Sequence, residues 1–275
     1  YQGAADKHQL VRLAKAIQLA AGKSPTGAEL KIDPKRIYFF GHSQGTVTGI
    51  PVVPFEPDIK AAVLSGAGGY LLASLLAKTK PVNIAGAIKL ALGDPSLGTG
   101  HPLLNLMQLF FEEVDAVNYG RPYFVKPETG QLPRHVFLSY GVADGYTPPG
   151  TIQALAWAMG LHQVKQDAQR CGDALCTGSE TCQTCEKDCD KCMGSSPCGN
   201  GVCEAASGEH CRNCPGDCKV GGATCKPEFL QADAPVRANI FSGKSKITAG
   251  VVKYSSDGTY DDHFVISKNK DARAQ

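Results

Sequence analysis

The sequence predicts an α/β fold with a mostly parallel sheet and a small cysteine-rich insertion. Along most of the 275 residues, apolar runs of strand length alternate with helical patterns, which is the rhythm of a parallel α/β sheet. One of these runs leads directly into a G-x-S-x-G turn. All 12 cysteines lie between Cys171 and Cys225, in a segment with eight acidic and four basic residues. The composition therefore changes at about residues 170 and 226, as expected for an inserted module.

These two changes in composition divide the chain into three units. A body with a cap is expected over 1–170, with the cap at about 70–132. The cysteine-rich repeat insertion spans 171–225, and residues 226–275 complete the body.

The stretch from Arg36 to Ile50 contains the most informative motif. An apolar strand leads into Gly41-His-Ser43-Gln-Gly45, and small residues follow. In such a strand-to-helix turn the serine hydroxyl is held clear of the backbone, and the two glycines let strand and helix approach closely. Ser43 is therefore a candidate nucleophile. The alternative is an ordinary glycine-rich turn.

The remaining elements of the body follow from periodicity. Strands are expected over 36–40, 59–64, 135–140 and 247–254, and helices over 71–77, 82–92, 103–111 and 151–160. Thr151 is a plausible N-cap for the last of these helices. A further helix over 4–21 is expected to bury one apolar face, made of Leu10, Val11, Leu13, Ala14, Ile17 and Leu19.

Composition also narrows the classes of function. The formal net charge is +2, so no electrostatic surface for nucleic acid is expected. No apolar run approaches the ~20 residues of a membrane-spanning helix. The chain opens at Tyr1 without an initiator methionine or a signal peptide, which indicates a processed leader or a fragment of a longer protein.

The cysteine-rich segment contains an internal repeat. Five cysteines of the first copy recur at similar spacings in the second, and one more follows each copy. In order they are Cys171, Cys176, Cys182, Cys185, Cys189 and Cys192, then Cys198, Cys203, Cys211, Cys214, Cys218 and Cys225. With hardly an aliphatic or aromatic side chain, the segment cannot form a core, so disulfide bonds are the first interpretation. The sequence does not choose among the possible pairings.

Two metal-binding alternatives remain open for this segment. Zinc would use the C-x-x-C pairs Cys182–Cys185 and Cys211–Cys214. Calcium would use oxygen ligands that recur at matching positions of the two copies, namely Asp173, Asn200, Glu180, Glu209, Asp188 and Asp217. No metal or other cofactor is expected for chemistry in the body.

The body contains residues that can supply the groups a nucleophilic serine needs. A serine hydroxyl requires an imidazole base, and the imidazole requires an orienting carboxylate. In parallel sheets such groups gather at the carboxyl ends of strands. Asp144 follows the strand that ends at Tyr140, and His263 lies in the loop after the last strand. Ser43, Asp144 and His263 therefore form a candidate triad, in the chain order that accompanies this turn.

Together these motifs resemble the α/β-hydrolase family, in particular its secreted bacterial esterases and lipases. The resemblance covers about 1–170 and 226–275, and its motifs are Gly41 to Gly45, Gly141 to Asp144 and Asp262 to Phe264. It implies an α/β-hydrolase-type sheet. It also implies the roles of four residues: Ser43 as nucleophile, His263 as general base and acid, Asp144 as orienting carboxylate and the Gln44 N–H as one oxyanion donor. His42, next to Ser43, is expected to turn its ring away from the serine and to shape the pocket.

The resemblance is incomplete at the start of the chain. Members of the family place several strands before the serine turn, whereas 42 residues precede Ser43 here. The resemblance therefore implies a sheet truncated at its N-terminal side, with an exposed edge and without a visible second oxyanion donor.

The substrate expected from the resemblance is a carboxylic ester with an apolar acyl group, because the cap segment is rich in leucine and phenylalanine. It would be cleaved through an acyl-enzyme by a secreted or otherwise extracytoplasmic protein. The alternative belongs to another class of protein. In it, a secreted adhesion or carbohydrate-binding protein uses the cysteine repeats, and the hydrolase body is inactive.

Other titratable residues are interpreted as structural or surface groups. They either lack a partner pattern or lie in turns, and they are His101, His135, His162, Asp58 and Asp94. Asp261 and Asp262 are expected to be loop or solvent-exposed groups.

Disulfides and zinc predict different numbers of reactive thiols. If the repeats are disulfide-bonded, titration of the denatured, unreduced protein should find essentially no free thiol. If thiolates bind zinc, denaturation with a chelator should release them. Twelve reactive thiols per chain would exclude the disulfide interpretation.

Overall fold

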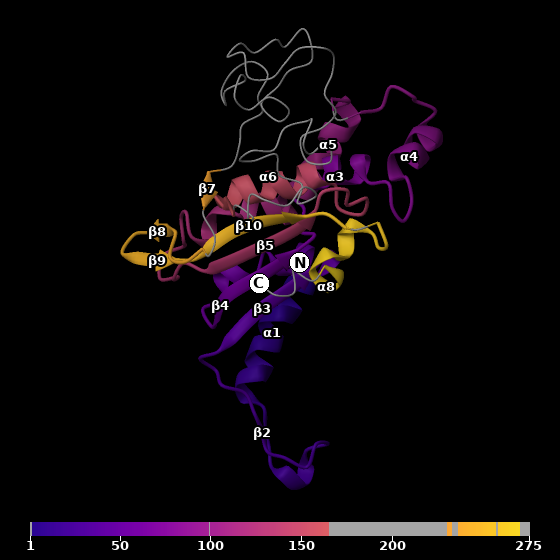
Figure 1. The fold of residues 1–275 in the computed structure, drawn as a ribbon. Coiled ribbons are helices and arrows are strands. Elements are labelled where there is room, and N and C mark those ends of the chain that lie inside the picture. The colour runs from indigo at the N-terminus through magenta and orange to yellow at the C-terminus, as the bar shows by residue number, and fades with distance from the viewer. Residues whose placement is uncertain (1, 99, 165–229, 233–235, 257, 270–275) are drawn as a thin grey trace.

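The computed structural model describes residues 2–98, 100–164, 230–232, 236–256 and 258–269. Its centre is a parallel sheet of six strands in the order β3-β4-β5-β10-β6-β7 (Figure 1). The strands are β3 (Ile37–His42), β4 (Ile59–Ser65), β5 (His135–Gly141), β6 (His162–Val164), β7 (Gln231–Ala232) and β10 (Ala249–Tyr254). The predicted α/β fold with a mostly parallel sheet is confirmed. The cysteine-rich insertion, with its zinc and calcium candidates, lies outside the described residues.

Helices surround this sheet and connect its strands. They are α1 (Gln2–Ala16), α2 (Gln44–Gly49), α3 (Leu71–Ala77), α4 (Ile84–Leu92), α5 (Pro102–Phe111), α6 (Pro149–Met159) and α8 (Val265–Lys268). Two short antiparallel pairs lie outside the sheet: β1 (Gln18–Leu19) with β2 (Leu30–Lys31), and β8 (Ile240–Ser242) with β9 (Ser245–Ile247). None of the described helices is long and apolar enough to cross a bilayer.

The main core lies on one face of the sheet. Side chains of a strand alternate between the two faces, so Val136 and Leu138 of β5 pack against Ile152 of α6, while Phe137 faces the opposite side. There Phe137 meets a smaller cluster that includes Val265 of α8. Figure 1 shows β5 and β10 next to one another, with α6 above them.

The prediction for the first helix is partly wrong. The helix ends at Ala16 rather than 21, because Gln18 and Leu19 form β1 and pair with β2. Its contact with α2 uses polar and small side chains: Lys7 Nζ donates to Thr48 Oγ1 at 2.6 Å. The helix buries Val11, whereas Leu10 and Leu13 are exposed. The predicted helical period is therefore confirmed, and of the predicted apolar face Val11 is buried and Ala14 half-buried, but the placement of Leu10 and Leu13 on that face is wrong.

The other predicted elements match the observed ones to within about two residues. One cap assignment is wrong, because α6 begins at Pro149 and Pro148 occupies the N-cap position. Thr151 lies inside the first turn, where its hydroxyl donates to the carbonyl oxygen of Pro148 at 2.8 Å.

The strand that precedes Ser43 is an edge strand. Among the described residues β3 pairs with β4 alone in the main sheet, which agrees with the exposed edge implied by the resemblance. Phe39 packs on the main core, but Tyr38 and Phe40 point to the other face and are 60% and 62% exposed. This end of the sheet is therefore covered on one face only.

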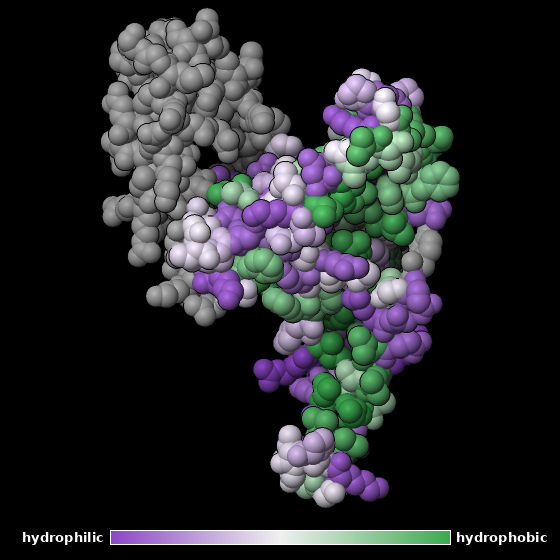
Figure 2. Space-filling view, turned by 90° about the vertical axis from the view of Figure 1, so that its right-hand side faces the viewer, coloured by the Kyte–Doolittle hydropathy of each residue, from purple (hydrophilic) through white to green (hydrophobic). Residues whose placement is uncertain are grey.

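Helices α3 to α5, with the turns after them, form a cap between β4 and β5. Leu72, Leu97 and Leu104 make a small core inside it. Other apolar side chains of the cap face outward, including Leu90 and Phe110, which are 85% and 80% exposed. Figure 2 shows hydrophobic residues gathered over this part of the molecule, in the upper right of the view. The cap therefore has an apolar exterior as well as an apolar interior.

A buried arginine stabilises the amino end of β5. Arg134 is 1% exposed. Its guanidinium donates to the carbonyl oxygens of Val53 (3.4 Å), Glu56 (3.2 Å) and Leu132, and to the side-chain oxygen of Gln131 (2.9 Å). The side chain thus satisfies several buried acceptors from two segments of chain that do not pair otherwise.

Replacing this side chain should destabilise the fold. Arg134→Met keeps much of the volume but leaves buried acceptors without donors, so the free energy of unfolding should fall by about 3 kcal/mol. Arg121→Met, at an exposed arginine, is the control and should change stability by less than about 0.5 kcal/mol. Urea denaturation of the two variants measures the difference, and equal midpoints would contradict the assigned role.

Candidate active site

The register of four strands aligns their carboxyl ends. His42 of β3 lies opposite Ser65 of β4, and Ser65 lies opposite Ser139 of β5. Gly141 of β5 lies opposite Tyr254 of β10. Because the strands are parallel, the loops that follow them leave the sheet at one edge. Those loops contain Ser43, Asp144 and His263.

Ser43 occupies a strained turn between β3 and α2. Its backbone angles are φ 52° and ψ −123°, a region that costs a non-glycine residue about 1–3 kcal/mol. Two contacts hold the turn: the Ser43 N–H donates to the Ser65 carbonyl at 2.9 Å, and the Ser43 carbonyl accepts from the Thr46 N–H at 2.9 Å. The register with β4 and the first turn of α2 therefore impose the conformation.

Close packing at this turn requires glycine, but not at both predicted positions. A Cβ at Gly41 would lie 2.7 Å from the Phe39 ring, and one at Gly49 would lie 2.0 Å from it. A Cβ at Gly45 would meet nothing within 4 Å. The expectation that Gly45 permits close approach is therefore wrong, because the strand packs against α2 through Phe39 and Gly49.

Asp144 and His263 are joined by a buried hydrogen bond. The distance between His263 Nδ1 and Asp144 Oδ2 is 2.8 Å, and both side chains are almost fully buried. The other Asp144 oxygen accepts the N–H groups of Tyr146 and Thr147, each at 2.8 Å. With the carboxylate held by its own loop, Nδ1 is the ring nitrogen that carries the proton and Nε2 is left to accept.

The His263 ring is enclosed on several sides. Tyr146 stacks on it with centroids 4.8 Å apart, and the His42 ring lies at 4.7 Å with a 46° tilt. Gly66, with φ +57°, comes so close that a Cβ there would lie 3.1 Å from His263 Cε1. The tight turn after β4 therefore requires glycine both for its backbone and for the space that it leaves to the imidazole.

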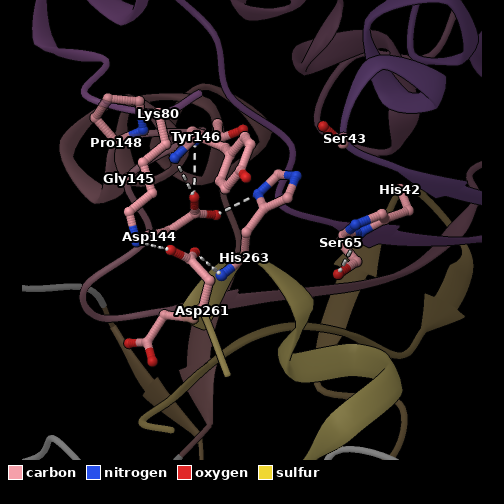
Figure 3. Close-up of polar contacts among 12 residues, drawn as sticks. His42, Ser43, Ser65, Lys80, Asp144, Gly145, Tyr146, Pro148, Asp261 and His263 are labelled. Carbon is pink, nitrogen blue, oxygen red and sulfur yellow. Dashed lines mark hydrogen bonds and ion pairs between the residues drawn. The ribbon is translucent and has the colours of Figure 1, made fainter. Parts of the chain in front are cut away.

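The structure does not join Ser43 to His263 by a hydrogen bond. In Figure 3 the ring nitrogen of His263 remote from Asp144 points to the side on which Ser43 lies, and no bond connects the two residues. Gln44 is the first residue of α2, where helix geometry leaves the N–H without an intrahelical acceptor. No second oxyanion donor can be assigned within the described ranges.

His42 lies against the imidazole rather than pointing elsewhere, contrary to expectation. Its Nδ1 is 3.2 Å from Ser65 Oγ, and its ring contacts those of His263 and Phe264. Burial, followed by the neighbouring His263, lowers the pKa of His42 below its ordinary value of 6.5, despite the opposing effect of Asp144. These surroundings favour the neutral form of the His42 imidazole.

The two aspartates before His263 are not the solvent-exposed groups that the sequence suggested. Asp262 is buried and accepts the N–H groups of Ala143 (2.7 Å) and Ser256 (2.9 Å), so it ties the Asp144 loop to the His263 loop. Asp261 accepts the N–H of His263 at 2.9 Å. The spacing of Asp261 two residues before His263 is the Asx-turn pattern that could have indicated this role.

The remaining histidines and turn aspartates have partners away from this site, as expected. His101 lies 3.1 Å from Asp94 within the cap, and Asp58 pairs with Lys15. His135 accepts the N–H of Thr248, and His162 contacts Asn239. Among the described residues, no group of three or more side chains is arranged to hold a metal ion.

Comparison with known proteins gives no sequence match. No protein-family model matches the chain, and no curated protein matches it either. Similar solved structures include acetyl xylan esterase 1 from Thermoanaerobacterium sp., with 16% identity, a TM-score of 0.39 and coverage of 57% of this chain and 42% of that one. An esterase from Pyrococcus furiosus has 18% identity, a TM-score of 0.31 and coverage of 57% and 46%. A monoacylglycerol lipase from Paleococcus ferrophilus has 22% identity, a TM-score of 0.23 and coverage of 44% and 53%. The chain thus spans about half the length of each of these proteins.

Proposed function

We propose that this chain is a serine hydrolase that cleaves carboxylic esters. The observation that carries the proposal is the buried hydrogen bond between Asp144 and His263, at the strand ends where the strained Ser43 also lies. Two features of His263 occur together here: one ring nitrogen bonds a buried carboxylate, and the other points to the side of a serine in a strand-to-helix turn. A histidine with a purely structural role would not need both.

In the proposed acylation step, Ser43 Oγ attacks the ester carbonyl carbon and His263 Nε2 takes the hydroxyl proton. Asp144 holds Nδ1–H and stabilises the imidazolium that forms. The tetrahedral intermediate then collapses: the carbon–oxygen bond to the alcohol breaks, and His263 returns the proton to the leaving alkoxide. This step leaves the acyl group on Ser43.

In the proposed deacylation step, water attacks the acyl-enzyme while His263 again acts as base. The acid leaves and Ser43 regains its proton. The developing oxyanion would accept the Gln44 N–H at the start of α2, and one such donor typically stabilises the transition state by about 3 kcal/mol. No metal or other cofactor takes part in this scheme.

Ser43 and His263 must come into contact for the reaction. Hydrogen bonds of this kind are often long or absent in a free enzyme and form when substrate binds. The proposal therefore requires that Ser43 Oγ and His263 Nε2 come within hydrogen-bond distance when substrate binds.

We also propose the substrate class and the location of the protein. The outward-facing apolar side chains of the cap, such as Leu90 and Phe110, favour an ester with an apolar acyl group. The 12 clustered cysteines favour disulfides and therefore a secreted or otherwise extracytoplasmic protein.

Removal of the nucleophile tests the proposed function. Ser43→Ala should reduce hydrolysis of a short-chain chromogenic ester by about four orders of magnitude or more, to background. Ser24→Ala, at a half-buried serine far from the site in the sequence, should hydrolyse at the wild-type rate. A fluorophosphonate probe should label the wild type and Ser24→Ala but not Ser43→Ala. Equal hydrolysis by wild type and Ser43→Ala would overturn the proposal.

The lowered pKa of His42 predicts a pH-dependent contribution to stability. Below about pH 6.5 the unfolded state takes up a proton at His42 more readily than the folded state does, so this residue weakens the fold as the pH falls. His42→Gln removes the titrating group and therefore this loss of stability at low pH. The stability difference between wild type and His42→Gln, from urea denaturation, should be constant above pH 7.5. It should move in favour of the variant between pH 7 and pH 5. A constant difference throughout would contradict the assignment.

A further inference from the structure

A short segment of the cap lies directly on the loops that carry Asp144 and His263. Residues 78–81, which we call the strap, begin the connection between α3 and α4. The N–H groups of Thr79 and Lys80 both donate to the Gly145 carbonyl, at 3.0 and 2.9 Å. The Thr79 hydroxyl approaches the same oxygen at 3.4 Å. The strap is thus bonded to the residue that follows Asp144.

The packing between the strap and Gly145 leaves no space for a side chain. A Cβ at Gly145 would lie 2.8 Å from Thr79 Oγ1 and 3.3 Å from the Lys80 side chain. A larger residue there would have to displace the Thr79 and Lys80 side chains. The glycine after Asp144 therefore permits the contact between the strap and the Asp144 loop.

Lys80 extends the strap to the second loop of the site. Its ammonium pairs with one oxygen of Asp261, and the other oxygen of that carboxylate accepts the His263 N–H at 2.9 Å. Burial has the largest single effect and raises the pKa of Asp261, but the hydrogen bonds from Lys80 and the His263 N–H, with the charges of these two residues, together lower the pKa below its ordinary value. Figure 3 shows Lys80 and Asp261 on either side of the Asp144–Gly145 turn.

We propose that Lys80 is a positioning residue, which holds the Asp144 loop and the His263 loop together and so makes the geometry of this pair depend on the cap. The inference rests on the proposed function. Asp262 joins the two loops from inside, through the Ala143 N–H, and Lys80 joins them from outside. An isolated surface ion pair contributes little to stability, but here the two backbone hydrogen bonds of the strap fix the base of the Lys80 side chain before its ammonium meets Asp261.

A double substitution separates positioning from electrostatics. Lys80→Met with Asp261→Asn removes one positive and one negative charge, so the field at the imidazole changes little. The amide introduced by Asp261→Asn keeps an oxygen that can accept the His263 N–H. The matched control is Lys15→Met with Asp58→Asn, which removes another Lys–Asp pair, between α1 and the turn before β4.

The double variant at Lys80 and Asp261 should lose about ten-fold in kcat with little change in KM, because a catalytic pair is misplaced while binding persists. The single variant Lys80→Arg, which keeps a positive charge beside Asp261, should retain most of the wild-type kcat. The control pair should match the wild type. Gly145→Ala, which displaces the strap by a different route, should lower kcat in the same direction.

A spectroscopic readout tests the strap without substrate. The proton on His263 Nδ1, bonded to Asp144, should give a downfield NMR resonance in the full-length wild type. This resonance should broaden or move upfield in the Lys80/Asp261 double variant and in Gly145→Ala, but not in the control pair. Thermal melts identify any variant that has unfolded. If the double variant is unfolded, Gly145→Ala and the single Lys80→Met decide whether the strap positions His263.

The outcomes distinguish the two proposals. A wild type as inactive as Ser43→Ala would remove the ester hydrolase proposal, and the NMR resonance would still decide whether the strap positions His263. Wild-type kcat and an unchanged resonance in the double variant would overturn the role of Lys80 and leave the hydrolase proposal intact.

Discussion

The site depends on one buried hydrogen bond, between His263 Nδ1 and Asp144 Oδ2, which joins residues 119 positions apart in the sequence. The bond exists because β10 lies beside β5 in the sheet, so that the loops after these two strands are neighbours. Several other contacts support it. The N–H groups of Tyr146 and Thr147 hold the carboxylate, and Asp262 fastens the two loops together. A carboxylate held in this way gives the imidazole one tautomer and one orientation, which are the properties that a general base requires.

Ser43 is supported differently, through the backbone. Its strained φ of 52° persists because the Ser65 carbonyl fixes its N–H and α2 begins immediately after it. Phe39 and Gly49 let that helix lie close to the strand. The strain at Ser43 and the hydrogen bond between Asp144 and His263 therefore have the same origin. Four parallel strands end at one edge of the sheet, and the tight turns after them direct their side chains toward one another.

Much of this arrangement follows from local sequence, and the remainder depends on long-range pairing. Periodicity located the strands and helices of the body, and the loops after the strands contained Ser43, Asp144 and His263. The placement of β10 between β5 and β6 could not be predicted, because strand order reflects contacts between distant segments. Lys80 was not identified for the same reason, since it meets Asp261 181 positions further along the chain. Local pattern likewise indicates that residues before His263 form a turn, but not that Asp262 is buried in it.

The strands that precede Ser43 and Asp144 differ in their number of neighbours in the sheet. Strand β5 lies between β4 and β10, so the Asp144 loop follows a strand that has a neighbour on each side. In the described structure β3 pairs with β4 alone, and Tyr38 and Phe40 are exposed on the face that lacks cover. An edge strand with one neighbour and one covered face has fewer contacts to fix its end. Ser43 therefore depends for its position on one neighbouring strand and on α2, whereas the Asp144 loop begins between two strands. In the proposed mechanism, the approach of Ser43 to His263 thus relies on an edge strand, and that of Asp144 to His263 on two central strands.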